Sequence, residues 1–544
     1  MKLRTWFIHT AVLLSTALTL PAFQAKPAAP TSGPGEKKGS ISGTVLDAVA
    51  GKSVKDVTLL LVNSAGAGKP ATTKSGEAGE FTFRDLDAGS YILMGDHPRY
   101  ARQTYGSRNG LMGGSPLTIS AGQEMREITF KVQPNAVASG RVLDEDGEPL
   151  QGVLVTPLKG MYHQGRRQHI PVGSAMSNDL GEYRIANLAA GTYVLSATLM
   201  RPGQSPAPAA DQPEETYITT YYPNATVVSA AAPVEVTVGA DMGGMDIKLA
   251  KARSVRVSGK VIGLAKDQKV SVRLIPKGAG FLAMITGKNA VVKPDGTFEI
   301  AGAIPGSYVL RANDARGMKP LSAGVPIEVG DKRIEDAVLE IATGAELAGA
   351  VVVEAGEQVP MKGARLILEA TEGLNMAPPN TMVAEDGTFT LKDVPADRYF
   401  VRLINGPQGS WVSSVQLGNQ KMDDQGLDLS HAGTGKLEVK LRLGGAQVDG
   451  VITGQDDKPL SGVTVALIPN SRKYLLYQST FTDQQGAFSF KGVTPGDYKL
   501  LSWEQVEPGA FQDPEFLKPF ESKAESVSLK ENDSKAVKMK AIPR

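Results

Sequence analysis

Short stretches of alternating apolar and polar residues, separated by turn residues, run along most of the chain. In "GEFTF" (79–83) the two phenylalanines lie two positions apart, so both point to one face of a strand. Leu86 and a turn follow, and Tyr91 and Leu93 then face inward on the next strand. Strands of this kind, with Gly, Pro and Asp turns every eight to twelve residues, predict antiparallel β-sandwiches. Convincing amphipathic helices are nearly absent.

This pattern occurs five times at a fixed spacing. The first Gly and the Tyr lie twelve positions apart in every copy: "GEFTFRDLDAGSYIL" (79–93), "GEYRIANLAAGTYVL" (181–195), "GTFEIAGAIPGSYVL" (296–310), "GTFTLKDVPADRYFV" (387–401) and "GAFSFKGVTPGDYKL" (486–500). Each copy is preceded by a strand that carries a Gly, namely Gly43, Gly140, Gly259, Gly349 and Gly450. The chain is therefore expected to be a tandem repeat of one kind of unit.

The repeated turn predicts specific local structure. Gly79 is expected in a hairpin turn, and Gly89 is expected to need a positive φ. The Tyr that follows can bury its ring and bond its hydroxyl to loop backbone, as tyrosine corners do in other sandwiches. A repeated row of binding tyrosines is the alternative. We favour the structural role, because the Tyr keeps its place in the turn in every copy.

The unit boundaries follow from the repeat. We expect sandwiches at 38–133, 134–252, 253–344, 345–444 and 445–544, the second with a long Pro/Ala/Tyr insertion. Residues 1–25 have the pattern of an export signal: a basic start, the apolar run "AVLLSTALTL" and a helix-breaking Pro21. Residues 26–37 are a Pro/Gly/Lys linker. The predicted fold class is all-β, with five tandem antiparallel Greek-key β-sandwiches, prealbumin-like or Ig-like, after a signal peptide.

Composition narrows the possible functions. Lys and Arg number 58 against 57 Asp and Glu, so a net charge of +1 provides no field to attract nucleic acid. The absence of cysteine excludes disulfides, cysteine-ligated metal centres and a lipid-modified N-terminal cysteine. No integral membrane segment is expected after signal cleavage, and the expected location is periplasmic or extracellular.

The repeat resembles a known domain family. "SGRVLDEDGEPLQGVLV" (139–155) and "DGVITGQDDKPLSGVTV" (449–465), each followed by the turn motif, resemble the carboxypeptidase regulatory-like domain. That family is similar to transthyretin and to Cna B-type repeats, which implies a seven-stranded sandwich in tandem copies of an exported bacterial protein. Unit three lacks the "G-x-P-L" turn, and Asp397 replaces the turn Gly in unit four. No Lys and Asn recur at matched strand positions, so no isopeptide cross-link is expected.

Catalytic chemistry is not expected. A zinc carboxypeptidase needs an H-x-x-E pair and a distant His, and none of the histidines after the signal has Glu at that offset. We found no G-x-S-x-G elbow and no phosphate-binding loop. No catalytic residue, metal or cofactor is predicted. His163 and His169 share the loop "MYHQGRRQHIPVG", for which a solvated hairpin tip is favoured over a metal site; "DEDG" (144–147) is favoured as a turn over a calcium loop.

Partner contacts are expected on loops and edges, because function in such sandwiches resides outside the shared strands. The segment "QDPEFLKPFES" (512–522) predicts a short helix capped by Asp513, either as an exposed apolar knob or as a lid on unit five. Two tryptophans are expected at equivalent edges of units four and five. The candidate contact residues are Tyr217, Tyr221, Tyr222, Trp411, Trp503, Phe511, Phe516 and Phe520.

Three functions remain open from the sequence. The favoured one is a non-enzymatic exported scaffold or protein-interaction module whose partner is another envelope or secreted protein. The alternatives are a polysaccharide-binding array that uses Tyr and Trp platforms, and an accessory protein for a separate hydrolase chain.

Overall fold

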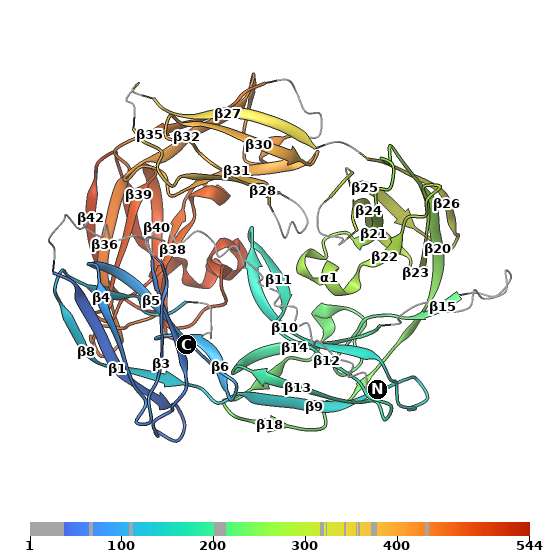
Figure 1. Cartoon of the computed structure of the whole chain (residues 1–544), viewed down its shortest axis with the longest axis horizontal. Helices are drawn as coiled ribbons and strands as arrows, with labels where there is room; N and C mark the ends of the chain where they lie inside the picture. Colours follow the sequence, from blue (N-terminus) through green and yellow to red (C-terminus); the bar gives the residue numbers. More distant parts are fainter. Residues whose placement is uncertain are drawn as a thin grey trace, which may run out of the picture.

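Five two-sheet β-sandwiches follow one another in the computed structural model, which confirms the predicted fold class (Figure 1). The structure describes residues 37–543, except 65–68, 108–112, 201–213, 316–319, 323, 342–343, 355, 357–358, 372–377 and 430–434. The predicted signal peptide and residues 26–36 of the predicted linker lie outside the described residues.

Unit one shows the plan that the other units vary. Its strands are β1 (Gly39–Asp47), β2 (Thr58–Asn63), β3 (Ala71–Lys74), β4 (Glu80–Leu86), β5 (Gly89–His97), β6 (Tyr100–Thr104), β7 (Leu117–Ile119) and β8 (Glu124–Val132). One sheet has the order β4-β1-β8 and the other β3-β2-β5-β6, with β7 also paired to β5. The first and last strands run parallel, unlike the purely antiparallel sandwich predicted, because the chain crosses back from the second sheet before β8.

Units two and three repeat this plan with additions. Unit two contains β9 (Ala136–Leu143), β10 (Val153–His163), β11 (Arg166–Pro171), β12 (Ala175–Met176), β13 (Glu182–Leu188), β14 (Gly191–Leu199), β15 (Glu214–Tyr217), β16 (Thr220–Tyr221), the 3-10 helix η1 (Val228–Ala230), β17 (Val234–Val236), β18 (Asp241–Met242) and β19 (Ile247–Lys248). Unit three contains β20 (Lys251–Ile262), β21 (Val270–Pro276), η2 (Gly280–Leu282), α1 (Ala283–Thr286), β22 (Lys288–Val291), β23 (Thr297–Ala303), β24 (Gly306–Asp314), β25 (Val325–Val329) and β26 (Ile334–Glu340). β15, from the insertion of unit two, pairs with β20 of unit three.

Units four and five complete the chain. Unit four contains β27 (Ala345–Val353), β28 (Arg365–Ala370), β29 (Asn380–Met382), β30 (Thr388–Val394), β31 (Arg398–Ile404), β32 (Trp411–Leu417), β33 (Gln420–Lys421), β34 (Leu427–Asp428) and β35 (Leu437–Arg442). Unit five contains β36 (Ala446–Thr453), β37 (Thr464–Pro469), η3 (Tyr474–Leu476), β38 (Gln478–Phe481), β39 (Ala487–Val493), β40 (Gly496–Trp503), η4 (Ala510–Gln512), α2 (Pro514–Leu517), η5 (Lys518–Lys523), β41 (Glu525–Leu529) and β42 (Ser534–Lys540). Each unit has its own buried core.

The predicted tyrosine corner is present in all five units. Every ring is buried, and every hydroxyl donates a hydrogen bond to the carbonyl oxygen four residues earlier. The distances are 2.7–2.9 Å for Tyr91, Tyr193, Tyr308, Tyr399 and Tyr498. The hydroxyl thus stays satisfied while the ring fills the core.

The predicted positive φ of the turn Gly is present, and a second positive-φ residue lies earlier in the turn. Gly89 has a φ of 158°, and its counterparts Gly191, Gly306 and Gly496 have φ of 146–156°, whereas Asp397 of unit four does not have a positive φ. The left-handed residues stand six positions after the motif Gly and are Asp85, Asn187, Gly302, Asp393 and Gly492, with φ of 54–72°. Asp, Asn and Gly tolerate this conformation. It creates the bulge that turns Leu86 and its counterparts into the core.

The strand glycines permit a close approach of two strands. A Cβ at Gly450 would lie 2.1 Å from the carbonyl oxygen of Val537 on β42, and the other four strand glycines have the equivalent contact at 1.9–2.4 Å. Because backbone cannot yield as a side-chain tip can, a larger residue there would push the last strand away from the first.

We expect Gly450→Ala to lower the free energy of unfolding of unit five by roughly 1–3 kcal/mol or more, because the added methyl group would overpack against backbone. Amide hydrogen exchange of the full chain, analysed unit by unit, measures this. Gly330→Ala is the matched control, because a Cβ there meets nothing within 4 Å. Equal protection of unit five in both variants would contradict the close-approach argument.

Candidate functional site: the central hairpin and the surfaces around it

The β10–β11 hairpin of unit two lies at the centre of the five units (Figure 1). His163 pairs with Arg166, so the loop is the two-residue turn Gln164–Gly165, with φ of 51° and 72°. Two positive φ values are typical of a type I′ turn, which matches the twist of the flanking strands. The predicted hairpin is present, but its tip is not solvated, because three other units contact it.

Unit five makes most of these contacts. The amide of Tyr162 donates to the carbonyl oxygen of Pro508 at 2.7 Å, and the Arg167 guanidinium makes a bidentate ion pair with Glu507 at 2.6 and 2.9 Å. A Cβ at Gly509, whose φ is 77°, would lie 2.4 Å from the carbonyl oxygen of Tyr162. The glycine therefore lets the two backbones meet.

Units four and three hold the other sides of the hairpin. The Gln164 side-chain amide donates to the carbonyl oxygen of Ala370 in unit four at 3.0 Å. The side-chain oxygen of Gln168 accepts a hydrogen bond from the amide of Phe281 in unit three at 3.3 Å. One hairpin thus contacts three units that are distant from it in sequence.

His163 lies between units four and five. Its ring centre is 6.4 Å from that of Tyr474, and Tyr474 also contacts Phe400 and the guanidinium of Arg402. Arg402 forms an ion pair with Glu369 at 3.2 Å, and both side chains are less than one-fifth exposed. Burial, and to a lesser extent the charge of Arg402, lowers the pKa of His163, although Glu369 opposes this shift. The neutral imidazole therefore fits the interface.

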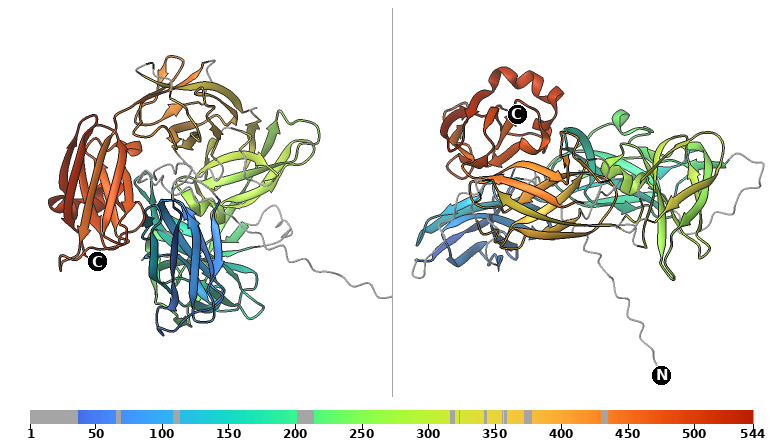
Figure 2. Two further views of the ribbon diagram at one scale, coloured as in Figure 1. Left: turned by 60° about the vertical axis from the view of Figure 1, so that its left-hand side comes forward. Right: turned by 90° about the horizontal axis from the view of Figure 1, so that it is seen from above.

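Further contacts join neighbouring units and connect the first unit to the last. The Ser115 hydroxyl of unit one donates to the carbonyl oxygen of Thr482 in unit five at 3.3 Å, and a Cβ at Gly462 would lie 2.4 Å from the carbonyl oxygen of Gly106. Unit two joins unit three through the β15–β20 pair. In both views of Figure 2 unit five lies beside units one and four. The five units therefore form a closed ring.

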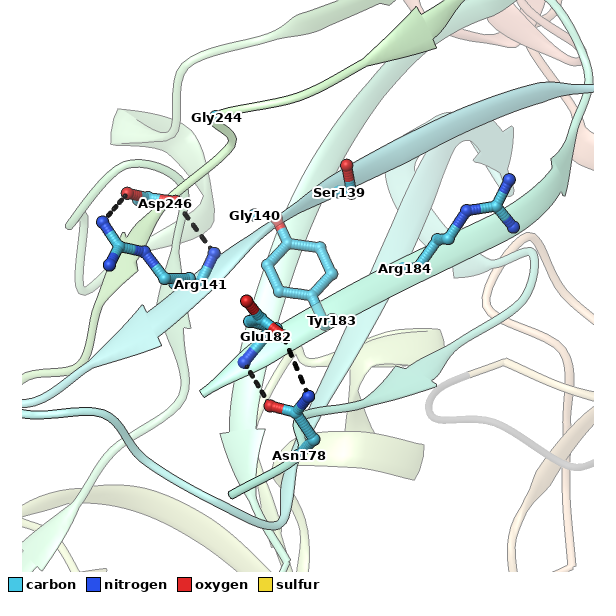
Figure 3. A pocket seen from close by; sticks show the side chains of 9 residues that line it. All are labelled: Ser139, Gly140, Arg141, Asn178, Glu182, Tyr183, Arg184, Gly244 and Asp246. Atoms are coloured by element: carbon cyan, nitrogen blue, oxygen red, sulfur yellow. Dashed lines mark hydrogen bonds and ion pairs between the residues drawn. The ribbon is translucent and has the colours of Figure 1, made fainter. Parts of the chain in front are cut away.

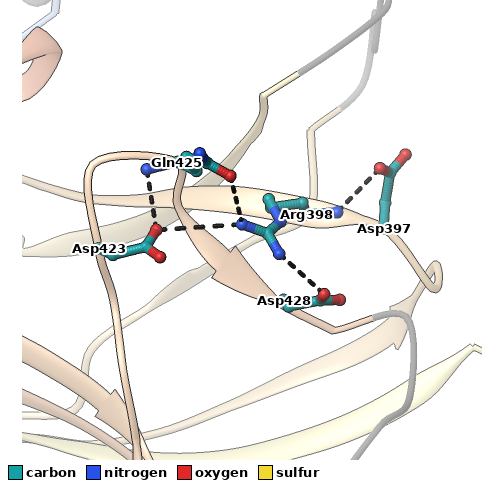
Figure 4. Close-up of polar contacts among 5 residues, drawn as sticks. All are labelled: Asp397, Arg398, Asp423, Gln425 and Asp428. Carbon is teal, nitrogen blue, oxygen red and sulfur yellow. Dashed lines mark hydrogen bonds and ion pairs between the residues drawn. The ribbon is translucent and has the colours of Figure 1, made fainter.

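Asp397 contacts Arg398 within unit four (Figure 4) and also connects unit four to unit three. It accepts a hydrogen bond from the amide of Arg398 at 2.8 Å and pairs with Arg311 of unit three at 3.2 Å. Arg398 in turn pairs with Asp428 at 3.0 Å and lies 4.0 Å from Asp423. The departure from the turn Gly thus supplies a contact between units.

The aromatic candidates of unit five form a second apolar layer. The predicted helix is α2, where Asp513 accepts a hydrogen bond from the amide of Glu515 and Pro514 is the first helical residue. The segment covers the outer face of the β38-β37-β40-β41 sheet, rather than the end of the sandwich. Trp503 and Phe511 are only 2% and 3% exposed. Both are core residues and not the exposed partner contacts that the sequence predicted. Phe516 and Phe520 are partly buried against them, and Phe516 contacts Tyr162 of the hairpin.

The remaining aromatic candidates also pack against protein. Tyr221 is 5% exposed and is corrected to a core residue, while Tyr217 and Tyr222 pack against the core of unit two. The ammonium of Lys251 lies 5.0 Å from the Tyr217 ring centre. Trp411 lies on β32, which pairs with β35, whereas Trp503 ends β40 in the other kind of sheet, so the two are not at equivalent edges as predicted. Contact of Tyr217, Tyr222, Trp411, Phe516 and Phe520 with a partner stays a prediction.

A polar depression of about 570 Å³ lies on the β13-β9 sheet of unit two (Figure 3). Several of its side chains are engaged with neighbours: Arg141 pairs with Asp246 at 3.6 Å, and Asn178 donates to Glu182 at 3.1 Å. The Tyr183 hydroxyl donates to the carbonyl oxygen of Met245. Across the described residues, no cluster of three or more His, Asp or Glu is arranged to hold a metal ion. No helix in the described part of the chain is long and apolar enough to span a membrane.

The predicted turn at 144–147 is confirmed. The Asp144 carboxylate accepts hydrogen bonds from the amides of Asp146 and Glu148, both at 2.9 Å. Glu145 forms an ion pair with Lys251, at the start of unit three.

Two domain families match parts of the chain. Residues 40–133 match the carboxypeptidase regulatory-like domain, and residues 444–506 match the second β-sandwich domain of BOS complex subunit NOMO1-like proteins. The predicted resemblance to tandem carboxypeptidase regulatory-like domains is confirmed.

Individual relatives match over short stretches. Serine-aspartate repeat-containing protein D of Staphylococcus aureus (strain Newman) is 31% identical over 130 residues, which cover 21% of this chain and 10% of that protein. Colossin-A of Dictyostelium discoideum is 27% identical over 160 residues, covering 27% of this chain and 1% of that protein. The chain thus spans about a tenth or less of the length of these relatives.

Solved structures with some similarity include GBS52, the minor pilin of Streptococcus agalactiae, at 14% identity and a TM-score of 0.24, covering 40% of this chain and 96% of that one. The Bacillus anthracis TIE protein has 13% identity and a TM-score of 0.16, covering 82% and 70%.

Charge reversal at the hairpin tests its role in closing the ring. Arg167→Glu places two carboxylates next to each other, and their repulsion should broaden the distribution of distances between units two and five. Adding Glu507→Arg restores an ion pair of opposite charges and should narrow the distribution again. The expected coupling is about 1 kcal/mol or less, because both side chains are about half exposed. Because the chain has no cysteine, spin labels at Asp179→Cys and Lys523→Cys report this distance uniquely. An unchanged distance distribution in the single variant would contradict the role of this pair.

Acidification should also loosen the hairpin. The lowered pKa of His163 means that the closed ring holds the imidazole neutral, so closure loses stability as the pH falls below about 6.5, the ordinary value of a free His. The distance distribution of the same label pair should broaden as the pH is lowered from about 7.5 to about 5. His163→Gln should reduce this response and His97→Gln, in unit one, should not; equal responses in both variants would contradict the assignment.

Proposed function

We propose that this chain is an exported, non-enzymatic scaffold that presents the loops and edges of five β-sandwiches in a fixed ring to another envelope or secreted protein. The observation that carries the proposal is the central hairpin, which contacts units three, four and five at once. Tandem sandwiches joined only by linkers would reorient independently. A ring held from its centre instead presents several surfaces at fixed spacing, which suits a partner that touches more than one unit.

Export rests on the N-terminal pattern of residues 1–25. The proposed location is periplasmic or extracellular. The partly buried tyrosines of unit two favour a covering role over a flat sugar platform, so the polysaccharide-binding alternative has no supporting observation of its own.

Photo-crosslinking in the producing cells tests the proposal. A crosslinkable residue is placed at one exposed position in each of three units: Arg84, Arg184 or Lys392. We expect one discrete protein adduct at one or more positions. Its yield should fall with Arg167→Glu, which weakens the contact between units two and five, and recover with the Arg167→Glu/Glu507→Arg pair.

Two results would overturn the proposal. One is the lack of any protein adduct at all three positions while the chain remains folded. The other is retention of the folded chain on a polysaccharide column with no loss in the Arg167→Glu variant, which would favour independent carbohydrate-binding units.

A further inference from the structure

Within the described residues, the last strands of units three and five are among those that leave one backbone edge unpaired, and both lie at the outside of the ring. In the described part of the chain β26 (Ile334–Glu340) pairs only with β20, and β42 (Ser534–Lys540) pairs only with β36. They are equivalent strands, since each is the last of its unit and runs parallel to the strand that carries the Gly. Unpaired N–H and C=O groups on such an edge are a template for a further strand.

Unit four shows what this edge accepts. Its last strand, β35, is equivalent to β26 and β42, but β32 covers its outer side in an antiparallel pair over Trp411–Leu417. In unit one the edge is partly covered, because the Gln103 side chain donates to the carbonyl oxygen of Lys131 on β8 at 2.5 Å. The fold thus admits an added antiparallel strand at a position that units three and five leave open.

The two open edges carry opposite charge. β26 exposes Glu335, Asp336 and Glu340, whereas β42 exposes Lys535, Lys538 and Lys540. Like charges opposite each other across a strand pair are destabilising and opposite charges are stabilising. Pairing of β26 with β26, or of β42 with β42, is therefore disfavoured, and pairing of β26 with β42 is favoured.

The side chains near these edges also favour pairing of β26 with β42. Val338 of β26 is 56% exposed, an unusual state for a large apolar residue in a strand. It lies between Asp336 and Glu340 on the same face of its strand, because side chains alternate along a strand. Ala536, Lys538 and Lys540 share one face of β42 by the same rule. An added β42 would cover Val338 and bring lysines beside its two acidic neighbours.

One molecule cannot make this pair with itself, because β26 and β42 lie at opposite ends of the long axis of the ring (Figure 1). We propose that the chain self-associates head to tail: β42 of one copy adds as an antiparallel strand to β26 of the next. The assembly then keeps a free β42 edge at one end and a free β26 edge at the other, so the contact can repeat and produces linear chains. A seven-residue strand pair is smaller than the interfaces of stable complexes. Assembly therefore depends on concentration and weakens with salt.

Two charge-reversed variants test the pairing. In variant one, Lys538→Glu/Lys540→Glu makes both edges acidic; in variant two, Asp336→Lys/Glu340→Lys makes both edges basic. The wild-type full chain should form concentration-dependent oligomers at low salt, measured by sedimentation velocity. Each variant alone should associate about tenfold more weakly or worse, equivalent to about 1.4 kcal/mol. An equimolar mixture of the two should recover oligomers, because each acidic edge then meets a basic one.

The mixture distinguishes lost pairing from lost folding, since a misfolded variant would not be rescued by the other. Monomeric wild type at every concentration in low salt would overturn the proposal. So would association that persists unchanged in each variant alone, which would place the contact on another surface, or variants that stay monomeric when mixed. Photo-crosslinking to a different protein could still succeed in each of these cases, so failure here is distinguishable from failure of the proposed function.

Discussion

Contact between the β10–β11 hairpin and units three, four and five makes five sandwiches into one body. Each sandwich has a core of its own and does not depend on its neighbours for the tyrosine corner or the strand glycine. The relative placement of the units depends instead on a few polar contacts around Tyr162, Gln164 and Gln168 and on aromatic packing at Phe516 and Tyr474. These contacts are individually modest, so the ring depends on their acting together.

Different residues of the sequence build the core of each unit and make the contacts between units. The repeated residues, such as Tyr399 and Gly349, build the same core in every unit. Residues that differ between units provide the contacts between them. Asp397 replaces the turn Gly of the repeat and reaches Arg311 of unit three, and the apolar layer around Trp503 is built on the sheet of unit five that receives the hairpin. Departures from the repeat thus mark the contacts that shape the ring.

Local structure was largely predictable from the sequence. The tyrosine corners, the hairpin turn at Gly79 and the capped helix at 514–517 follow from short-range spacing and residue chemistry, and the structure confirms them. Gly89 has the predicted positive φ, but a second positive-φ residue earlier in the same turn, Asp85, was not predicted. The signal that was missed is the recurrence of Asp, Asn or Gly at Asp85 and its four counterparts, which are the residue types that accept this conformation.

The ring was not predictable in the same way. Gln164 bonds to Ala370 across 206 residues of sequence, and no periodicity reports such a pair. One signal was present: β10 has 11 residues, whereas the equivalent strands of the other units have 6 or 7, so it extends beyond its own sandwich. The apolar character of Trp503 and Phe511 was visible, but a buried layer and an exposed contact surface have the same composition. Only the long-range packing distinguishes them.

The ring itself is the claim on which the account depends, and small-angle X-ray scattering of the full chain in solution tests it most directly. A closed ring predicts a single compact particle whose radius of gyration is not far above the roughly 24 Å that scaling gives for a chain of this length. An elongated profile with a radius of gyration of about twice that value, as expected for five sandwiches in a string, would contradict it.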